Sequence, residues 1–428
     1  MGRSALFLAT ALAIPFYAFP ILTVAGRPID AATLFAAVFL LVSLPSLLRL
    51  LREDRARALF ATAAVAVPLL VLLAPRHPTF SPAAFAVSLA HWLLVAGFFL
   101  AAATLTLDAG ERRRFLGANL VVGIAVAGFA LYQAFGHARG WPGAGESILP
   151  NQRAPFRMLG YDGYPRPTSF FLEPGYLGGY LTWISLLALA ATASRERRES
   201  QALPVAAFSV AVLGVAMSLS WGAYADLAAV VLVVLILARR LPREARARLR
   251  PFAAVFAVAI LTAAVTPLTG AFVKRLHRLS RTPLDRSAPA VVHADSAVVR
   301  VENLRYIAGL FRSEPLTGIG LGQFQIRGAA RTGSPRESPW CGWAAAAALF
   351  GVLGPALVAA GPLLLLRNGR WHPHLLAAGT VALAVVDQVH TASFIDLRWW
   401  LPLAAVVALS GPGSRAAGRS SGSVPVPP

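Results

Sequence analysis

Cysteine, lysine and acidic residues are all scarce in this sequence. Cys341 is the single cysteine among 428 residues, which excludes disulfides within the chain and thiolate metal sites. Lys274 is the single lysine, and only 14% of the residues are charged, against about 25% in soluble domains. A soluble globular fold is therefore excluded. The net charge of +20 comes from arginine, but no basic soluble domain is expected that would bind nucleic acid.

Long apolar runs dominate the sequence, of which 57% is hydrophobic. A helix needs about 20 apolar residues to cross a lipid bilayer. We therefore expect an all-α polytopic membrane protein with about 12 transmembrane helices. The predicted spans are residues 4–25, 31–48, 58–74, 83–107, 115–136, 174–193, 202–220, 222–238, 252–270, 341–366, 375–391 and 398–410.

Arginines in the short loops predict how the chain is oriented. Basic residues in short loops mark the cytoplasmic side of a membrane. The basic short loops all fall on one side, so both termini are expected in the cytoplasm, beneath a cell inner (plasma) membrane. These loops contain Arg49, Arg52, Arg55, Arg57, Arg112–Arg114, Arg195, Arg197, Arg198, Arg239–Arg250, Arg367 and Arg370. The short loops opposite contain Arg27, Arg76 and Arg398.

Two long outward loops, the larger one partly helical, interrupt the spans. The predicted organisation is transmembrane helices 1–5 in 1–136, a first outer (periplasmic-side) loop in 137–173, helices 6–9 in 174–270, a large outer loop in 271–340, helices 10–12 in 341–410 and a disordered cytoplasmic tail in 411–428. Long loops are exempt from the charge rule, yet both outer loops are basic. An anionic ligand outside the membrane would explain that charge.

Glu173 lies where the first outer loop meets the next span, in the stretch from Arg166 to Tyr180. Pro174 suits the first turn of a helix, where its missing N–H is not needed. One interpretation of Glu173 is structural, because the helix dipole favours a carboxylate at a helix N-terminus. The other is a general base at the outer membrane surface. Arg166 would then lie at the level of the lipid headgroups.

The second outer loop contains an arginine-rich segment that predicts a helix. Asp295 or Ser296 can cap its start, and Pro315 requires it to end nearby. Apolar residues at helical spacing are expected to bury one face. They are Val301, Leu304, Ala308 and Phe311.

The arginines of this helix allow two interpretations. Arg305 and Arg312 are seven residues apart and share a face, whereas Arg300 is turned away from Arg305 by about 140°. They form either a solvated basic face or a pyrophosphate clamp, since the planar guanidinium binds phosphate oxygens in bidentate fashion.

Glycines at alternate positions follow, namely Gly318, Gly320 and Gly322. No strand–turn–helix unit surrounds them, which excludes a nucleotide-binding loop. They are expected to let the backbone turn tightly against the membrane surface.

Other polar and aromatic residues gather at the outer ends of the spans. Asp226, Asp387, His390 and Asp396 are ionisable, but close to an interface each alone is expected to be structural. Tryptophans at the span ends predict an aromatic belt. They are Trp221, Trp340, Trp343, Trp399 and Trp400.

Two motifs in this order, Arg166–Tyr180 and Arg300–Phe324, resemble the O-antigen polymerase/O-antigen ligase family of bacterial membrane glycosyltransferases. The succession of many spans, a short outer loop and a large outer loop before the last spans is similar too. The resemblance implies transfer of a glycan from an undecaprenyl-pyrophosphate-linked donor to a glycan acceptor, without metal or cofactor. It further implies a role in lipopolysaccharide or exopolysaccharide synthesis and a chain-length regulator protein as a candidate partner beside the lipid bilayer.

The resemblance also assigns roles to individual residues. Arg166 and Arg300 would bind the pyrophosphate, and with Glu173 they are the expected catalytic residues. Arg157, Arg305 and Arg312 are the further candidates for substrate binding.

Some residues depart from the ligase pattern. Ligases of this family carry a His-Asn pair before the helix that follows the large loop, where this chain has Ser338 to Trp343 without histidine. The Glu173–Pro174 pair favours the polymerase branch. A ligase acting on a lipid or protein acceptor stays the alternative. A transporter or flippase, or a non-catalytic scaffold, is the rival from another class, although charges at span ends and the lack of related halves argue against transport.

Overall fold

The computed structural model describes most of the chain as helix. The described residues are 2–24, 27–74, 77–144, 167–171, 173–193, 200–240, 243–265, 296–332, 339, 341–367, 374–391 and 393–410.

The elements in the first 138 residues are α1 (Arg3–Ala13), the 3-10 helix η1 (Ile14–Phe16), strands β1 (Pro20–Val24) and β2 (Arg27–Asp30), α2 (Ala31–Glu53), α3 (Arg55–Leu69), η2 (Leu70–Leu73), α4 (Pro82–Ala102) and α5 (Ala109–Ala138). A second group of helices consists of α6 (Pro174–Ala193), α7 (Ala202–Met217), α8 (Trp221–Ala238) and α9 (Arg243–Val265). After them follow α11 (Ser296–Ser313), α12 (Gln323–Thr332), α13 (Gly342–Phe350), η4 (Gly351–Leu353), α14 (Gly354–Arg367), α15 (His374–His390), η5 (Ser393–Ile395) and α16 (Leu397–Leu409).

Short polar side chains begin many of these helices, because they accept a hydrogen bond from an otherwise unpaired backbone N–H. The Asp108 carboxylate accepts from the N–H of Glu111, and the Glu111 carboxylate accepts from the N–H of Asp108, so α5 begins with a capping box. Ser220 accepts from Ala223 at the start of α8, which confirms the predicted break at 220–222. The same kind of cap is made by Asp30, Asp54, Ser81 and Asp396.

The first predicted span is wrong in its second half. Helix α1 and η1 end at Phe16, and Pro20–Val24 pairs with Arg27–Asp30 as an antiparallel hairpin. The apolar, β-branched character of residues 20–24 fits a strand as well as a helix. Hydropathy alone did not distinguish the two.

Helix α6 is the centre of the second group of helices. It contacts α5, α7, α8, α9 and α15. In its most apolar stretch of 18 residues, 83% of the residues are buried, the highest share among the candidate membrane spans of the described residues. Three neighbours approach it at a glycine, since a side chain there would overlap an aliphatic side chain of α6. These pairs are Gly123–Ile184, Gly214–Leu181 and Gly379–Leu186.

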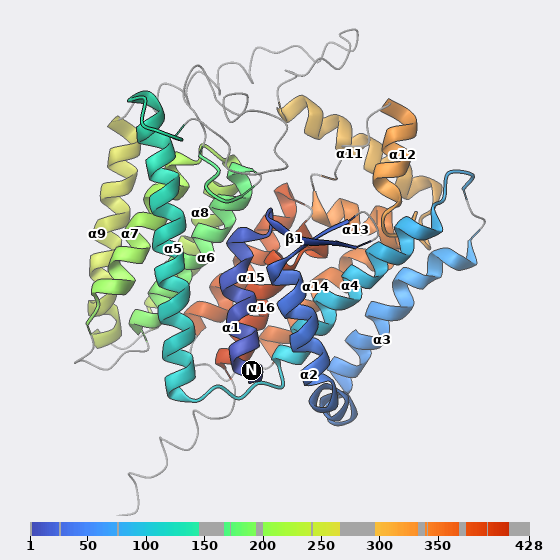
Figure 1. Ribbon diagram of the computed structural model, residues 1–428, viewed down its shortest axis with the longest axis horizontal. Helices are drawn as coiled ribbons and strands as arrows, with labels where there is room; N and C mark the ends of the chain where they lie inside the picture. Colours follow the sequence, from blue (N-terminus) through green and yellow to red (C-terminus); the bar gives the residue numbers. More distant parts are fainter. Residues whose placement is uncertain are drawn as a thin grey trace, which may run out of the picture.

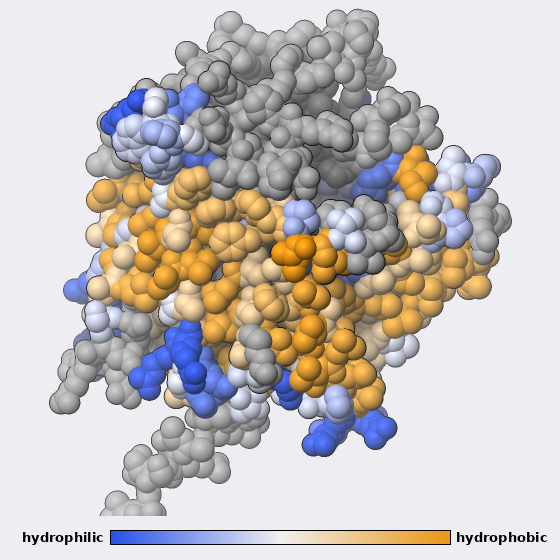
Figure 2. All heavy atoms as spheres, viewed as in Figure 1, coloured by the Kyte–Doolittle hydropathy of each residue, from blue (hydrophilic) through white to orange (hydrophobic). Residues whose placement is uncertain are grey.

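The helices form a multi-pass membrane protein. Within the described residues, seven helices are long and apolar enough to cross a bilayer, and four shorter apolar helices accompany them. Every predicted span overlaps a helix or, for 341–366, the pair α13 and α14, whereas the number of twelve crossings stays a prediction. Hydrophobic atoms form a broad band across the molecule, with hydrophilic patches above and below it (Figure 2).

The molecule has two ends across this band. The N-terminus lies at the lower end in Figure 1, whereas α11, α12 and the C-terminal end of α5 lie at the upper end, here named the loop face. Gln133 near the end of α5 accepts hydrogen bonds from the backbone N–H groups of Thr168 and Ser169. The start of α6 therefore also belongs to the loop face.

The glycine-rich turn between α11 and α12 is anchored on the loop face. Gly318, Gly320 and Gly322 all have positive φ, of 67°, 89° and 73°, which confirms that the backbone turns tightly there. The Ile319 N–H donates to the Ala348 carbonyl at 2.8 Å, and Gln323 exchanges two hydrogen bonds with the Ser81 backbone. The arginine-rich helix is thereby held against α13 and the start of α4.

The buried face of α11 differs from the expected one. Helix α11 ends at Ser313, before Pro315, as predicted. Its buried residues are Asn303, Ile307 and Leu310, whereas Leu304 is 41% exposed. The apolar residues predicted at 304, 308 and 311 lie about 100° round the helix from the face that packs.

The aromatic belt is wrong for two of its tryptophans. Trp399 and Trp400 are buried, and their indole N–H groups donate to the carbonyls of Ala384 and Phe394. Tryptophan serves both interface and interior because its large ring needs only one polar partner. Trp340 lies outside the described residues.

A first prediction concerns the orientation of the loop face. A reporter fused at Arg286, in the large loop, should show the activity of an exported protein, and one fused after Leu409 that of a cytoplasmic protein. The physical reason is the arginine bias of the short loops. Cytoplasmic-type activity at Arg286 would reverse the topology and remove the basis for an outer-face site.

Candidate functional site

The candidate site begins at the N-terminus of α6. Residues 167–171 precede it as a segment that is buried except at Phe170, which is partly buried. Within it, Ser169 has a positive φ of 51°, and its hydroxyl donates to the Val126 carbonyl. The Glu173 carbonyl accepts from the N–H groups of Tyr176 and Leu177, which makes Glu173 the residue before the first helical turn, as predicted. Its side chain is only partly buried and lies on the loop face.

An arginine held between aromatic rings lies beside this turn. The guanidinium carbon of Arg398 is 3.9 Å from the ring centre of Tyr176 and 4.1 Å from that of Tyr17. A cation over an aromatic face is attracted by the ring quadrupole, the more so where water is excluded. Three segments far apart in sequence, η1–β1, α6 and α16, are therefore joined at one side chain.

Asp396 neutralises Arg398 and begins α16. Its carboxylate accepts from the Arg398 guanidinium and from the Arg398 backbone N–H. Burial alone would raise the pKa of Asp396, but the Arg398 charge outweighs burial and holds that pKa below its ordinary value. The ion pair is therefore formed at neutral pH.

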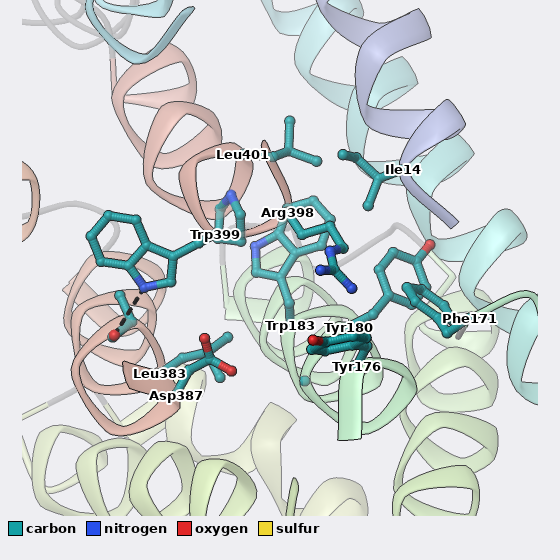
Figure 3. A pocket seen from close by; sticks show the side chains of 13 residues that line it. Ile14, Phe171, Tyr176, Tyr180, Trp183, Leu383, Asp387, Arg398, Trp399 and Leu401 are labelled. Carbon is teal, nitrogen blue, oxygen red and sulfur yellow. Dashed lines mark hydrogen bonds between the residues drawn. The ribbon is translucent and has the colours of Figure 1, made fainter. Parts of the chain in front are cut away.

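A cavity of about 60 Å³ lies between α6, α15, α16 and η1. Figure 3 shows the Asp387 carboxylate and the Arg398 guanidinium on different sides of it, with Trp183 between them in this view. Among the described residues, the Tyr180 hydroxyl, the Trp183 indole N–H and one Arg398 nitrogen are buried without a hydrogen-bond partner. Buried polar groups are normally satisfied, so this cavity suits water or a small polar group.

The predicted site residues are distributed unevenly over the described part of the chain. Glu173 lies at the start of α6, and Arg305 and Arg312 are both exposed on α11. Arg300 belongs to α11, but its side chain lies outside the described residues, and so do Arg157 and Arg166. The described residues thus place Glu173 and the arginine-rich helix on one face, but no contact between them is described.

Sequence reasoning missed the roles of Tyr176 and Arg398. Arg398 was counted as a loop charge and Tyr176 was given no role. The available signal was the adjacency of Asp396 and Arg398 at the edge of an apolar run, because a charge beside a membrane helix needs a partner.

The comparisons with known proteins are negative: no protein-family model matches the chain, and no curated protein matches it. The family resemblance therefore rests on the two motifs themselves.

A second prediction tests the Asp396–Arg398 pair. Asp396→Asn retains an oxygen for the helix cap but leaves Arg398 without a counter-charge. The free energy of unfolding should fall by about 2 kcal/mol, between the values for exposed and buried pairs. Because the pKa of Asp396 is lowered on folding, the pair stabilises above the ordinary carboxyl pKa of about 4, and this stabilisation is lost as pH falls below it.

Thermal unfolding of the purified protein in detergent measures the difference between variant and wild type, which should stay constant from about pH 5 to 8 and shrink toward pH 3. Asp30→Asn, which changes the equivalent cap of α2, is the matched control. Equal losses in the two variants would mean that Asp396 acts as a cap alone.

Proposed function

We propose that the protein is a membrane glycosyltransferase that polymerises undecaprenyl-pyrophosphate-linked oligosaccharide repeat units into a surface polysaccharide. The reaction would take place on the outer face of the inner membrane. The observation that carries the proposal is Glu173 at the start of the central helix α6, on the same face as the arginine-rich helix α11. A partly buried carboxylate and several guanidinium groups are what transfer from a pyrophosphate carrier requires.

The reaction assigns a separate task to each kind of residue. The acceptor hydroxyl attacks the anomeric carbon of the donor sugar, a new C–O bond forms, and the bond to the pyrophosphate oxygen breaks. Glu173 takes the hydroxyl proton, and the carrier leaves with the bonding electrons. Arg166 and Arg300 stabilise the negative charge on that leaving group, with Arg157, Arg305 and Arg312 as further contacts.

The position of Glu173 limits its strength as a base. The N-terminus of α6 favours the ionised carboxylate, which lowers its affinity for a proton. Glu173 would therefore act either as a modest general base or by orienting the acceptor through a hydrogen bond. Both roles need a side-chain oxygen at residue 173, but only the first needs a carboxylate that can take up a proton.

The reaction products separate this proposal from its alternatives. Purified lipid-linked oligosaccharide should be lengthened without ATP or an ion gradient, which a flippase or a scaffold would not do. Deletion in the cell should leave single repeat units on the carrier. Full-length polymer accumulating on the carrier would instead indicate the ligase alternative.

A third prediction addresses Glu173. General base catalysis contributes about 10²–10⁴-fold, so Glu173→Gln and Glu173→Ala should both lose activity of that order if the carboxylate takes the proton. Initial rates with purified lipid-linked oligosaccharide measure the loss. Arg52→Ala, on the exposed last turn of α2, is the control: it is purified and assayed in the same way and should keep the wild-type rate.

Near-normal rates for Glu173→Gln with loss for Glu173→Ala would show orientation rather than proton transfer. If neither variant loses activity, Glu173 is only a helix start. The next candidates for the base are then Asp295 and His293, two ionisable residues just before the arginine-rich helix.

A fourth prediction addresses the arginines. Arg166→Ala and Arg300→Ala should each abolish transfer while insertion and abundance stay normal. Lysine at either position should restore little activity, because an ammonium group lacks the planar fork of arginine. Arg139→Ala, in the same first outer loop and with its guanidinium over Trp141, is the matched control. Wild-type turnover in Arg166→Ala would remove the main anion-binding residue from the proposal.

A further inference from the structure

A second group of ionisable residues joins α8 to α15 below the loop face. Asp387 and His390 lie on the last turn of α15, three residues apart and thus on one face. Asp226 lies in the second turn of α8. His390 Nε2 is 2.9 Å from Asp226 Oδ1, and one ligand atom from each of the three residues lies within 4.8 Å of the others.

One glycine lets α8 and α15 approach here, and a second lies beside the two carboxylates. A Cβ atom at Gly222 would overlap the imidazole of His390, so a residue with a side chain would keep α15 away from α8. A Cβ atom at Gly179 would lie 3.8 Å from both Asp226 Oδ2 and Asp387 Oδ1. The two carboxylate oxygens therefore face the same point beside α6.

One of these oxygens has no partner. Asp226 is 0% exposed, and its Oδ2 makes no hydrogen bond within the described residues. The other oxygen of Asp226, Oδ1, is hydrogen-bonded to His390 Nε2. Oδ2 of Asp387 accepts hydrogen bonds from the side chains of Gln388 and Thr391. Burying an unpaired carboxylate oxygen is unfavourable, more so in an apolar membrane helix. With both carboxylates ionised, the group is net negative even if the imidazole is protonated.

We infer that Asp226, Asp387 and His390 form a binding site for a divalent metal cation. Carboxylate oxygen and imidazole nitrogen together suit ions such as Mn²⁺ or Zn²⁺. In octahedral coordination, two neighbouring ligands that are each about 2.1 Å from the metal are about 3.0 Å apart. The 2.9 Å between His390 Nε2 and Asp226 Oδ1 is a hydrogen-bond distance in the structure and is also close to that separation.

The adjoining cavity completes the site. Gly179 and Asp387 line both the carboxylate cluster and the cavity of about 60 Å³. A water molecule occupies about 30 Å³ in the liquid, so the cavity has room for water ligands beside three protein ligands. The cation would fasten α15 to α8, and no step of the proposed glycan transfer depends on it.

Direct binding of Mn²⁺ to the full-length protein tests this inference. The protein is purified in detergent, stripped with a chelator and titrated with Mn²⁺, whose free ion is counted by electron paramagnetic resonance. One tightly bound Mn²⁺ per chain is expected, and Zn²⁺ should displace it. Asp226→Asn and Asp387→Asn, which keep the side-chain shape, should each weaken binding at least tenfold. Asp30→Asn, a carboxylate that caps α2, should not change it.

The pulsed spectrum of bound Mn²⁺ in the wild type should show coupling to an imidazole nitrogen, and this measurement decides the matter even if the variants misfold. Absence of stoichiometric Mn²⁺ binding, equal binding in wild type and Asp226→Asn, or bound Mn²⁺ without nitrogen coupling would each overturn the inference. The first of these results would instead favour a proton shared between the two carboxylates. None of these results bears on glycan transfer, which is measured separately.

Discussion

Charges inside an apolar bundle must be neutralised where they lie, and this requirement organises the region where α6, α15 and α16 meet. Arg398 is neutralised by Asp396 and covered by the rings of Tyr17 and Tyr176. Without that arrangement a guanidinium at the start of α16 would draw water into the bundle. Because Tyr176 lies in the first turn of α6, the same contacts set the position of Glu173 relative to the bundle.

Close helix packing is the second condition for this arrangement. Within a membrane there is little hydrophobic force between helices, so contact depends on small residues that let backbones approach. Helix α6 is approached at glycines of α5, α7 and α15, and His390 reaches Asp226 because residue 222 is glycine. The glycine positions therefore determine how closely the helices approach, and with that where the ionisable side chains lie.

Periodicity and hydropathy were enough to predict most of the described helices, although not α12, and they did not predict the contacts between helices. The break before Trp221, the start of α6 at Pro174 and the end of α11 before Pro315 follow from local rules about caps and proline, and all three were predicted. The hairpin at 20–30 was missed because an apolar run of that length is compatible with either structure. The prediction of the buried face of α11 was wrong because the spacing of apolar residues does not determine which face packs against a neighbouring helix.

The same distinction holds for the site. Glu173 and the arginines of α11 are recognisable in the sequence because each lies within a motif. Asp226, Asp387, His390 and Arg398 were seen one by one as residues at span ends, and their convergence depends on the packing of α8, α15 and α16.

Asp387 connects the two charged groups, since it lines the cavity that Arg398 also lines and faces the point shared with Asp226. A negative charge at Asp387 would attract cations into the cavity. A cation bound between Asp226 and Asp387 would offset that charge, and Arg398 and Asp396 would then dominate the electrostatic field in the cavity. Whether the cavity favours a positively or a negatively polarised group therefore depends on whether a cation or a proton neutralises Asp226 and Asp387. A charge acts over a longer distance in an interior of low dielectric than in water. The charge of the group formed by Asp226, Asp387 and His390 therefore contributes to the electrostatic field at the start of α6.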